Sequence, residues 1–401
     1  MSDKRDKPDM TSSFRRRFMH FMVHELHLSV TDQGVLVFFL IVPLLYPLIY
    51  TFIYNNETIR EVPAVVVDQS GTTTSRQYLR LIDATPDVRL VHHAASLDEA
   101  RTWVNRREAY GIILVPYDFS DRLHNGEQVN VRLFCDMSGL LYYKALLTAN
   151  TNVSLTMNAD IKVDRAGKTT NREEEITEHP IAYEEVSLYN PTNGFAAFLI
   201  PAVLILIIQQ TLILGVGMSA GTARERNTLR SLVPIQYCRG GTLSILLGKA
   251  AAYALIYIPV SIYVLGVVPH LFRLNQIGNP ADLALFVLPF LLASIFFAMT
   301  LSAVVRHRET CIMLFVFSSV LLLFISGVSW PGTAVPPMWK VVSWCIPSTF
   351  GINGFLKINN MGATLYEARH EWLNLWLLAG IYFATTCLVY RQTIRRSRYR
   401  F

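Results

Sequence analysis

Charged residues are scarce in this 401-residue sequence. Asp, Glu, Lys and Arg make up 16% of it, whereas they make up about 25% of an ordinary soluble protein. Hydrophobic residues reach 52%, which counts against a soluble enzyme and excludes a disordered or collagen-like chain, because such chains contain far fewer apolar residues. The formal net charge of +6 would by itself suggest a nucleic-acid partner, so the position of the charges decides its meaning.

Acidic residues and arginine are absent from six long apolar runs. A run of about 18 or more apolar residues predicts a transmembrane helix, since about 20 residues cross the hydrocarbon core of a membrane. Lys249 is the one charged residue in these runs, and it lies near the end of the third. Buried helices of a soluble core are shorter and keep a polar stripe. We therefore expect six spans, at 34–54, about 195–220, 245–268, 283–305, 311–329 and 372–390.

The first run does not have the pattern of a cleavable signal peptide. It starts late, it is longer than the apolar region of such a peptide, and Asn55-Asn56-Glu57 follows it in place of a small-residue cleavage site. We expect it to remain as an anchor.

The loops on the two sides of these spans differ in charge. Six spans put both termini on one side, together with the loop 221–244 (with Lys249 at its far end) and the segment 306–310. That side holds 18 Lys and Arg against 7 Asp and Glu, whereas the other side holds 18 against 23. The positive-inside rule predicts that the termini are cytoplasmic. The basic excess therefore reports orientation in a lipid membrane, and we expect no nucleic-acid partner.

About 140 polar residues, 55–193, separate the first two spans, which is enough for a domain with its own core. Short apolar and β-branched runs predict strands at 62–68, 88–91, 110–115 and 129–134, and the segments 74–84, 96–107 and 140–157 favour helices. The fold class that we expect is a polytopic α-helical membrane protein with an inserted α/β domain. The acidic segment 172–185 favours a solvated surface over a metal site.

Motifs for ATP hydrolysis and for metal catalysis are lacking. Gly248-Lys249 is the nearest approach to a phosphate-binding loop, but Leu243 replaces the first glycine and Ala250 stands where Ser or Thr must hold magnesium. ATP use must therefore come from a partner. His24-Glu25-Leu26-His27 resembles a zinc-protease motif, yet its second histidine comes one residue early.

Residues 13–30 have the pattern of an amphipathic helix on the inner membrane surface. His20, His24 and His27 share a face with two arginines, Arg16 and Arg17, which favours a solvated face over a metal site, and Glu25 points away from the histidines. The opposite face carries apolar side chains: Phe14, Phe18, Phe21, Met22 and Leu26.

Polar residues inside the spans are few. Most of them favour hydrogen bonds between helices, and Gln209 and Gln210 are the best candidates for lining a translocation pathway. The absence of a buried ionisable group disfavours a proton- or ion-driven transporter. Cys135 and Cys345, the only cysteines on the outer side, are compatible with a disulfide or with two free thiols.

Four segments, in this order, resemble the permeases of ATP-binding-cassette type-2 exporters, and more narrowly the branch with a large periplasmic domain after the first helix. They are PAVVVD (63–68) with GIILVPYDF (111–119) and FCD (134–136), the inner loop ARERNTLRSL (223–232), GK (248–249), and SGVSWP (326–331) with PPMW (336–339) and IPST (346–349). Asn227 replaces the glycine usual in the inner loop. Because Asn tolerates the left-handed conformation, we expect the turn to survive.

The resemblance implies a bacterial inner-membrane permease, not an enzyme, that pairs with a second permease chain as a homo- or heterodimer. Two cytoplasmic ATP-binding-cassette ATPases would bind ATP and magnesium, so the permease itself needs no cofactor. Arg224, Glu225, Thr228 and Leu229 would lie on a coupling helix. The outer domain would contact a periplasmic adaptor and through it an outer-membrane channel, or gate the exit. The substrate would be a drug, a lipid or another amphipathic envelope compound.

The expected organisation is an N-terminal segment 1–33, a first span 34–54, an outer domain 55–193, spans 2–6 in 194–390 and a basic tail 391–401. The region 194–390 includes the coupling loop 221–244 and an outer re-entrant hairpin, 330–371.

A membrane receptor with a ligand-sensing outer domain is the alternative. Such a receptor usually continues into a cytoplasmic signalling domain, whereas 11 residues follow Tyr390, and five further spans exceed the needs of an anchor. A membrane-embedded enzyme would need a nucleophile–base pair or metal ligands within the spans, and the sequence shows neither.

Overall fold

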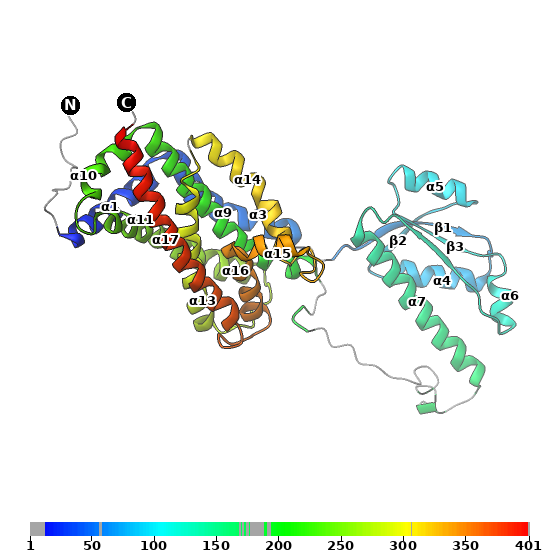
Figure 1. Cartoon of the computed structure of the whole chain (residues 1–401). Coiled ribbons are helices and arrows are strands. Elements are labelled where there is room, and N and C mark those ends of the chain that lie inside the picture. Colours follow the sequence, from blue (N-terminus) through cyan, green and yellow to red (C-terminus); the bar gives the residue numbers. More distant parts are fainter. Residues whose placement is uncertain are drawn as a thin grey trace. The chain divides into compact units, whose positions relative to one another are not determined.

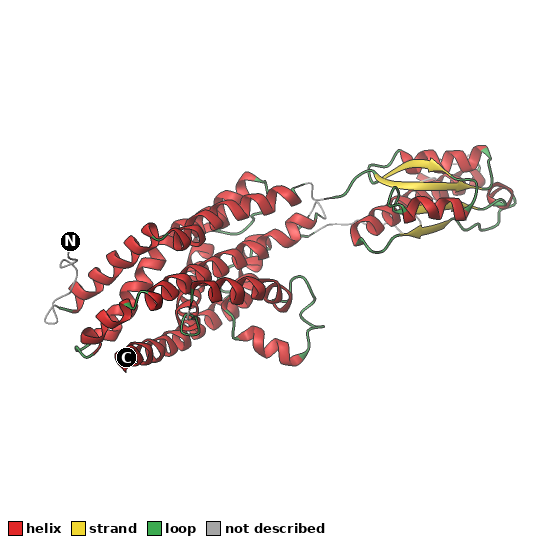
Figure 2. Ribbon diagram, turned by 90° about the horizontal axis from the view of Figure 1, so that it is seen from above, coloured by secondary structure: helices red, strands yellow, loops and turns green. Residues whose placement is uncertain are grey.

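The computed structural model describes residues 13–55, 58–167, 170, 172–173, 176, 188–190, 194–305 and 307–399, and of 314–315 and 397–399 it describes the backbone alone. The chain divides into two compact units. The helical unit is Met1–Asn55 with Leu188–Phe401, and the sheet unit is Asn56–Ser187. Figure 2 shows helices in the first unit and a sheet flanked by helices in the second. Most of the acidic segment 172–185 lies outside the described residues.

Six helices among the described residues are long and apolar enough to cross a membrane, as predicted. The first comprises α2 (Gln33–Leu36), the π-helical η1 (Val37–Ile41) and α3 (Val42–Tyr54). The others are α9 (Phe195–Glu225), α11 with η3 and α12 (Gly241–Ile262, Tyr263–Val267, Val268–Leu271), α13 (Pro280–Leu301), α14 (Arg308–Ile325) and α17 (Arg369–Tyr399). In α9, 94% of the most apolar stretch is buried, against 56% or less in the other five. The second span is therefore the centre of the bundle.

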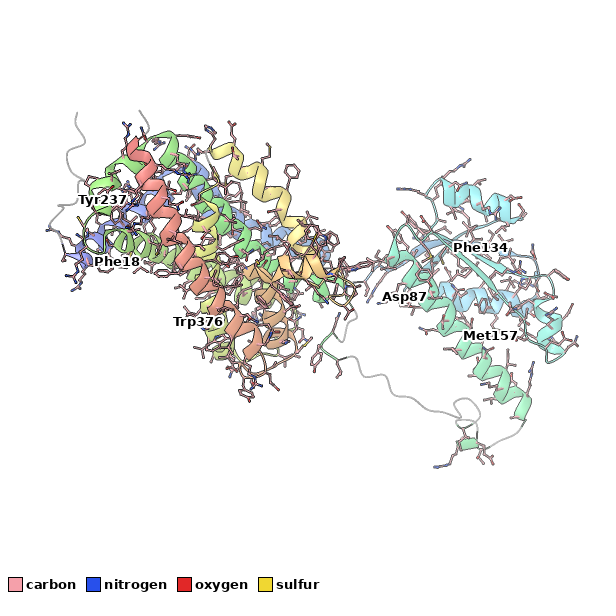
Figure 3. All side chains as sticks on the ribbon, viewed as in Figure 1. Phe18, Asp87, Phe134, Met157, Tyr237 and Trp376 are labelled. Carbon is pink, nitrogen blue, oxygen red and sulfur yellow. The ribbon has the colours of Figure 1, made fainter. Side chains whose placement is uncertain are left out.

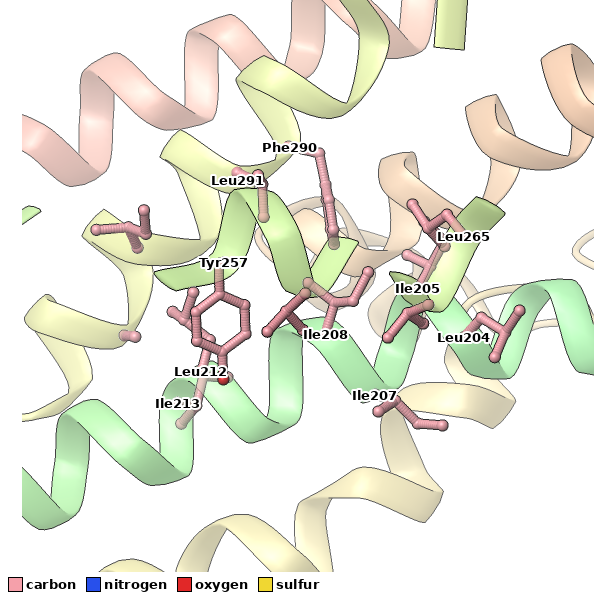
Figure 4. Packing of buried hydrophobic residues seen from close by; sticks show 14 of the residues in the cluster. Leu204, Ile205, Ile207, Ile208, Leu212, Ile213, Tyr257, Leu265, Phe290 and Leu291 are labelled. Carbon is pink, nitrogen blue, oxygen red and sulfur yellow. The ribbon is translucent and has the colours of Figure 1, made fainter. Parts of the chain in front are cut away.

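The core around α9 is aliphatic and aromatic. Figure 4 shows Ile208 and Leu212 of α9 near Tyr257 of α11 and near Phe290 of α13. The buried hydroxyl of Tyr257 donates a hydrogen bond to Thr211 Oγ1 at 3.0 Å. Such a closely packed helix transmits strain along its length, because protein interiors compress little.

Two prolines in the spans lack the N–H that would bond to the backbone carbonyl four residues earlier. In each case a side chain from another part of the chain donates a hydrogen bond to that carbonyl. Pro269 has no N–H for the carbonyl of Leu265, and Gln276 Nε2 donates to that oxygen at 3.0 Å. Likewise Trp372 Nε1 of α17 donates, at 3.2 Å, to the carbonyl four residues before Pro289. These bonds satisfy carbonyls that would otherwise be costly in an apolar surrounding.

One end of the helical unit gathers α1 (Phe14–Thr31), the 3-10 helix η2 (Thr228–Leu232), α10 (Val233–Gln236) and the last turns of α17, and we call it the terminal end (Figure 1). A small cluster joins these elements: Phe21, Ile235, Ile245 and Ile394. Phe18 and Tyr237 mark the same end in Figure 3.

Helix α1 forms as predicted, but its buried face differs from the expected one. Arg17, Phe21, Glu25 and Ser29, spaced four apart, are the buried residues, and a Cβ on Gly248 of α11 would lie 2.8 Å from the carbonyl oxygen of Phe18. The prediction that Arg17 lies on a solvated face was therefore wrong. Glu25 is buried as well. The periodicity of residues 13–30 does not show this buried face, because the helix that packs against it, α11, is distant in the sequence.

Three short helices follow α14 at the other end: α15 (Pro337–Trp344), α16 (Pro347–Phe355) and the π-helical η4 (Leu356–Asn360). α16 is largely buried and packs against α9, α13 and α17. A Cβ on Gly351 would lie 2.6 Å from the ring of Phe290, so the glycine permits this close approach.

The sheet unit contains a four-stranded sheet in the order β2-β1-β3-β4. β1 (Val62–Asp68) pairs in parallel with β2 (Val88–His93) and with β3 (Gly111–Val115), and β4 (Arg132–Cys135) is antiparallel to β3. One face packs against α4 (Thr73–Asp83), α6 (Phe119–His124) and α7 (Leu140–Ala166), and the other packs against α5 (Leu97–Asn105). The predicted strands and helices all form, and α6 is an addition.

The neighbouring histidines His92 and His93 of β2 have different surroundings. His92 stacks on Trp103 with 3.8 Å between ring centroids, while His93 is exposed. Within the described part of the chain, no three His, Cys, Asp or Glu side chains come close enough to hold a metal ion. Cys135 lies in the sheet unit and Cys345 in the helical unit, and both are free thiols.

Candidate functional site

The two neighbouring glutamines of α9 point to different surroundings. Gln209 is fully buried, and its Nε2 donates a hydrogen bond to Ser348 Oγ of α16 at 3.2 Å. Gln210 is 7% exposed, and neither of its amide atoms finds a partner among the described residues. A buried amide without hydrogen bonds costs free energy, so Gln210 is the group that a ligand could satisfy.

Gln210 lines a cavity of about 260 Å³ between the first span, α9 and α14. Its walls are mostly aliphatic, and the polar groups in them are neutral: Tyr46, Tyr50, Gln210, Thr211 and Ser319. The amide of Gln210 offers a donor and an acceptor side by side. The cavity can therefore hold an apolar molecule that carries an uncharged hydrogen-bonding group.

The four predicted coupling residues lie on two elements and not on a single helix. Arg224 and Glu225 are the last residues of α9, and Thr228 and Leu229 begin η2. Between them Asn227 adopts a left-handed conformation with φ +57°. The turn predicted to tolerate Asn in place of glycine therefore forms.

Side-chain contacts fix both ends of this turn. Thr228 Oγ1 donates to the carbonyl of Ala223 at 3.1 Å. Glu225 Oε1 accepts a bond from the backbone N–H of Arg308 at 3.0 Å. Because Arg308 is the first residue of α14, the carboxylate of Glu225 caps that helix and links it to the end of α9.

A buried ion pair connects α1 to the bundle. Lys249 Nζ of α11 lies 2.7 Å from Glu25 Oε2, and the other oxygen of Glu25 accepts bonds from Tyr253 at 2.5 Å and from Ser219 at 2.8 Å. Burial raises the pKa of Glu25, but the charge of Lys249 and the three hydrogen bonds outweigh it, so the net shift is downward. Glu25 is therefore ionised at neutral pH.

A second ion pair joins the starts of two spans. Asp32 Oδ1 accepts bonds from the N–H groups of Gly34 and Val35 and from the guanidinium of Arg308, while Oδ2 accepts a bond from Thr222 at 3.3 Å. Burial acts to raise the pKa of Asp32, and the backbone N–H bonds together with Arg308 lower it further than burial raises it.

Neither ion pair was predicted from the sequence. The partners are 224 and 276 positions apart, and no spacing rule connects them. We also expected no buried ionisable group within the spans. The buried carboxylate of Glu25 comes from α1, outside the spans, and pairs with Lys249 near the start of the third span. The available signal was the presence of Lys249 in an otherwise uncharged span and of lone carboxylates next to apolar runs.

A family model described as ABC-2 family transporter protein matches residues 34–388. The chain belongs to the ABC-2 transporter family. No curated protein matches the sequence.

ABC-2 family membership makes the helical unit the membrane-spanning part of a transporter permease. The family implies an ATP-binding-cassette ATPase as partner, which agrees with the altered phosphate-binding pattern around Lys249. Nothing supports the receptor alternative.

Proposed function

We propose that this ABC-2 permease exports a drug, a lipid or another amphipathic envelope compound from a bacterial inner membrane. The terminal end of the bundle faces the cytoplasm in this proposal, because the segments on that side hold 18 Lys and Arg against 7 Asp and Glu. The partner ATPase, with its ATP and magnesium, then docks on the segment 223–240 and on α1.

The cavity at Gln210 is the observation that carries the proposal. It adjoins the central helix, its walls are apolar, and the buried amide of Gln210 has no partner among the described residues. An amphipathic molecule would gain hydrophobic contacts there and would satisfy the amide. Gln209 does not line this cavity, and we assign it to packing against α16.

The remaining parts of the chain have roles that follow from this orientation. Movement of the ATPase reaches α9 and α14 through Arg224, Glu225, Thr228 and Leu229. A second permease chain, identical or different, completes the pathway. On the outer side, α15 and α16 form a re-entrant hairpin, and the sheet unit contacts an adaptor leading to an outer-membrane channel or gates the exit.

Isolation of the native complex tests the assignment as a permease. We expect an ATP-binding-cassette ATPase to stay bound in mild detergent, and mass spectrometry of the purified sample would identify it together with an adaptor and the number of permease chains. We expect the permease alone to hydrolyse no ATP. Hydrolysis by the isolated chain, or a complex without any ATPase, would contradict the proposal.

Substitution of Gln210 tests the pathway. In the reconstituted complex, stimulation of ATP hydrolysis by a panel of neutral and charged amphipathic compounds would be measured. We expect Gln210→Leu to weaken the apparent affinity for the best neutral compound about fivefold to tenfold, the value of one hydrogen bond, with basal hydrolysis retained. Gln209→Leu, next to it in α9 but facing Ser348, is the matched control. Equal behaviour of the two variants would refute the pathway.

A further inference from the structure

We propose that Asp32 and Arg308 form an inner gate. The gate closes the Gln210 cavity toward the terminal end, and it opens when the coupling loop 221–244 moves. The inference rests on the proposed pathway, because a gate needs a route to close.

The position of the ion pair supports this role. Asp32 directly precedes the first span, Arg308 begins α14, and Thr222, which bonds to Asp32, lies in the last turns of α9. These are the same three spans whose middle portions line the cavity. Thr222 and Gln210 are twelve positions apart on α9, so the pair lies about 18 Å along the helix from the buried amide.

The three spans meet closely at this point. A Cβ on Gly34 would overlap the guanidinium of Arg308, and a Cβ on Gly221 would lie 3.1 Å from the backbone nitrogen of Arg308. Farther along α9 the same spans separate enough to leave the cavity of about 260 Å³. The ion pair therefore lies at the narrow end of the space that the three spans border.

The two ion pairs differ in how easily they can separate. The side chains of Glu25 and Lys249 are 1% and 13% exposed, and the helices that they join pack along their lengths. Asp32 is 4% exposed, but Arg308 is 30% exposed. Water can therefore reach the guanidinium when the pair opens, which lowers the cost of separation relative to a fully buried pair.

Glu225 connects the gate to the coupling loop 221–244. Its carboxylate holds the first backbone N–H of α14, and it lies two residues before the left-handed turn at Asn227. A displacement of that turn by the ATPase would pull on Arg308 at the same time. The pair would then open in step with the nucleotide cycle.

Cys311 is a native reporter for this gate. It lies one turn beyond Arg308 on α14, it is fully buried, and its thiol donates to the carbonyl of Leu214, a residue that lines the cavity. With the other four cysteines replaced by serine, a charged methanethiosulfonate added to inside-out vesicles would reach Cys311 only through the opened gate.

The variants separate the charge of the gate from its local structure. Asp32→Asn keeps an oxygen that can cap α2 and removes the charge, and Arg308→Gln removes the other partner. Glu309→Gln, an exposed carboxylate next to Arg308, is the matched control. We expect Cys311 in the full complex to react at least tenfold faster in both gate variants than in the parent and the control.

Equal labelling rates in the parent, the two gate variants and the control would overturn the gate. A labelling rate of the parent that does not change when ATP is added would overturn it too. Because labelling needs no substrate, this result is independent of the Gln210→Leu measurement. Failure of the gate and failure of the pathway are therefore distinguishable.

Discussion

At the scale of residues, the contact between Glu25 and Lys249 is the most deeply buried charge pair among the described residues. Four groups meet there, with Tyr253 and Ser219 binding one oxygen of Glu25 and Lys249 binding the other. A buried ion pair need not add stability over an apolar pair, but removal of one partner leaves an uncompensated charge. The pair therefore fixes where α1 lies.

We predict that Lys249→Met destabilises the helical unit by about 3–5 kcal/mol, because it leaves Glu25 buried without a counter-charge. The thermal midpoint of the purified complex in detergent would measure the change. The double variant Glu25→Gln with Lys249→Met should recover a large part of the loss. A double variant no more stable than Lys249→Met would contradict this account.

We predict that acid destabilises the helical unit through the same residue. The pKa of Glu25 in the folded chain lies below the ordinary 4.5, so its stabilising effect is complete above that pH and is lost as the pH falls through the lowered pKa. Thermal midpoints would be compared between pH 7 and pH 3 for the parent and for Glu25→Gln. The parent should lose stability more steeply below about pH 4.5, and parallel curves would disprove the assignment.

At the scale of elements, the end of α9 shows how one residue sets the path of the chain. Asn227 has φ +57° between the end of α9 and the start of η2. Glycine reaches this region freely and Asn more easily than most other residues. The turn places Glu225 against α14 and Thr228 against Ala223.

We predict that Asn227→Ala lowers the amount of substrate exported per ATP hydrolysed, because alanine strains this conformation by about 1 kcal/mol. Asn227→Gly should retain the ratio of the parent. Arg226→Ala, at a neighbouring position with an ordinary φ of −80°, serves as the control. The ratio would be measured in proteoliposomes that contain the ATPase, and an equal loss in the glycine variant would exclude a backbone effect.

At the scale of the whole molecule, the chain contains two units with separate cores. In the sheet unit, β1 and β3 carry buried side chains on both faces of the sheet. Leu146 of α7 is fully buried against one of these faces. The core of the helical unit surrounds α9. Each core is built from residues of its own unit.

We predict that residues 58–167 fold without the spans, because their core is complete within that segment. The isolated segment should unfold cooperatively in urea with a free energy of about 5–15 kcal/mol, followed by circular dichroism. Leu146→Ala should lower that value by about 2–5 kcal/mol, and a segment without a cooperative transition would show that the unit needs the spans.

Much of this architecture could be predicted from local patterns. The six spans follow from the absence of charge over runs of about 20 residues, and the strands of the sheet unit follow from short β-branched runs such as 62–68. The left-handed turn at Asn227 was expected from the resemblance, because Asn stands where glycine is usual and tolerates the same conformation. The spans and strands depend on neighbours in sequence, so composition and periodicity are enough to find them.

The sequence by itself determined the spans, the uneven charge of their loops and the order of segments typical of an ABC-2 permease. Tertiary structure alone decided that Glu25 is buried against Lys249, that Asp32 meets Arg308, and that Gln210 rather than Gln209 lines a cavity. Charge pairs and cavities arise where helices distant in sequence pack together. The free energy of burying a charge depends on the groups that pack against it and bond to it. The hydropathy of a sequence does not show which helix supplies those groups.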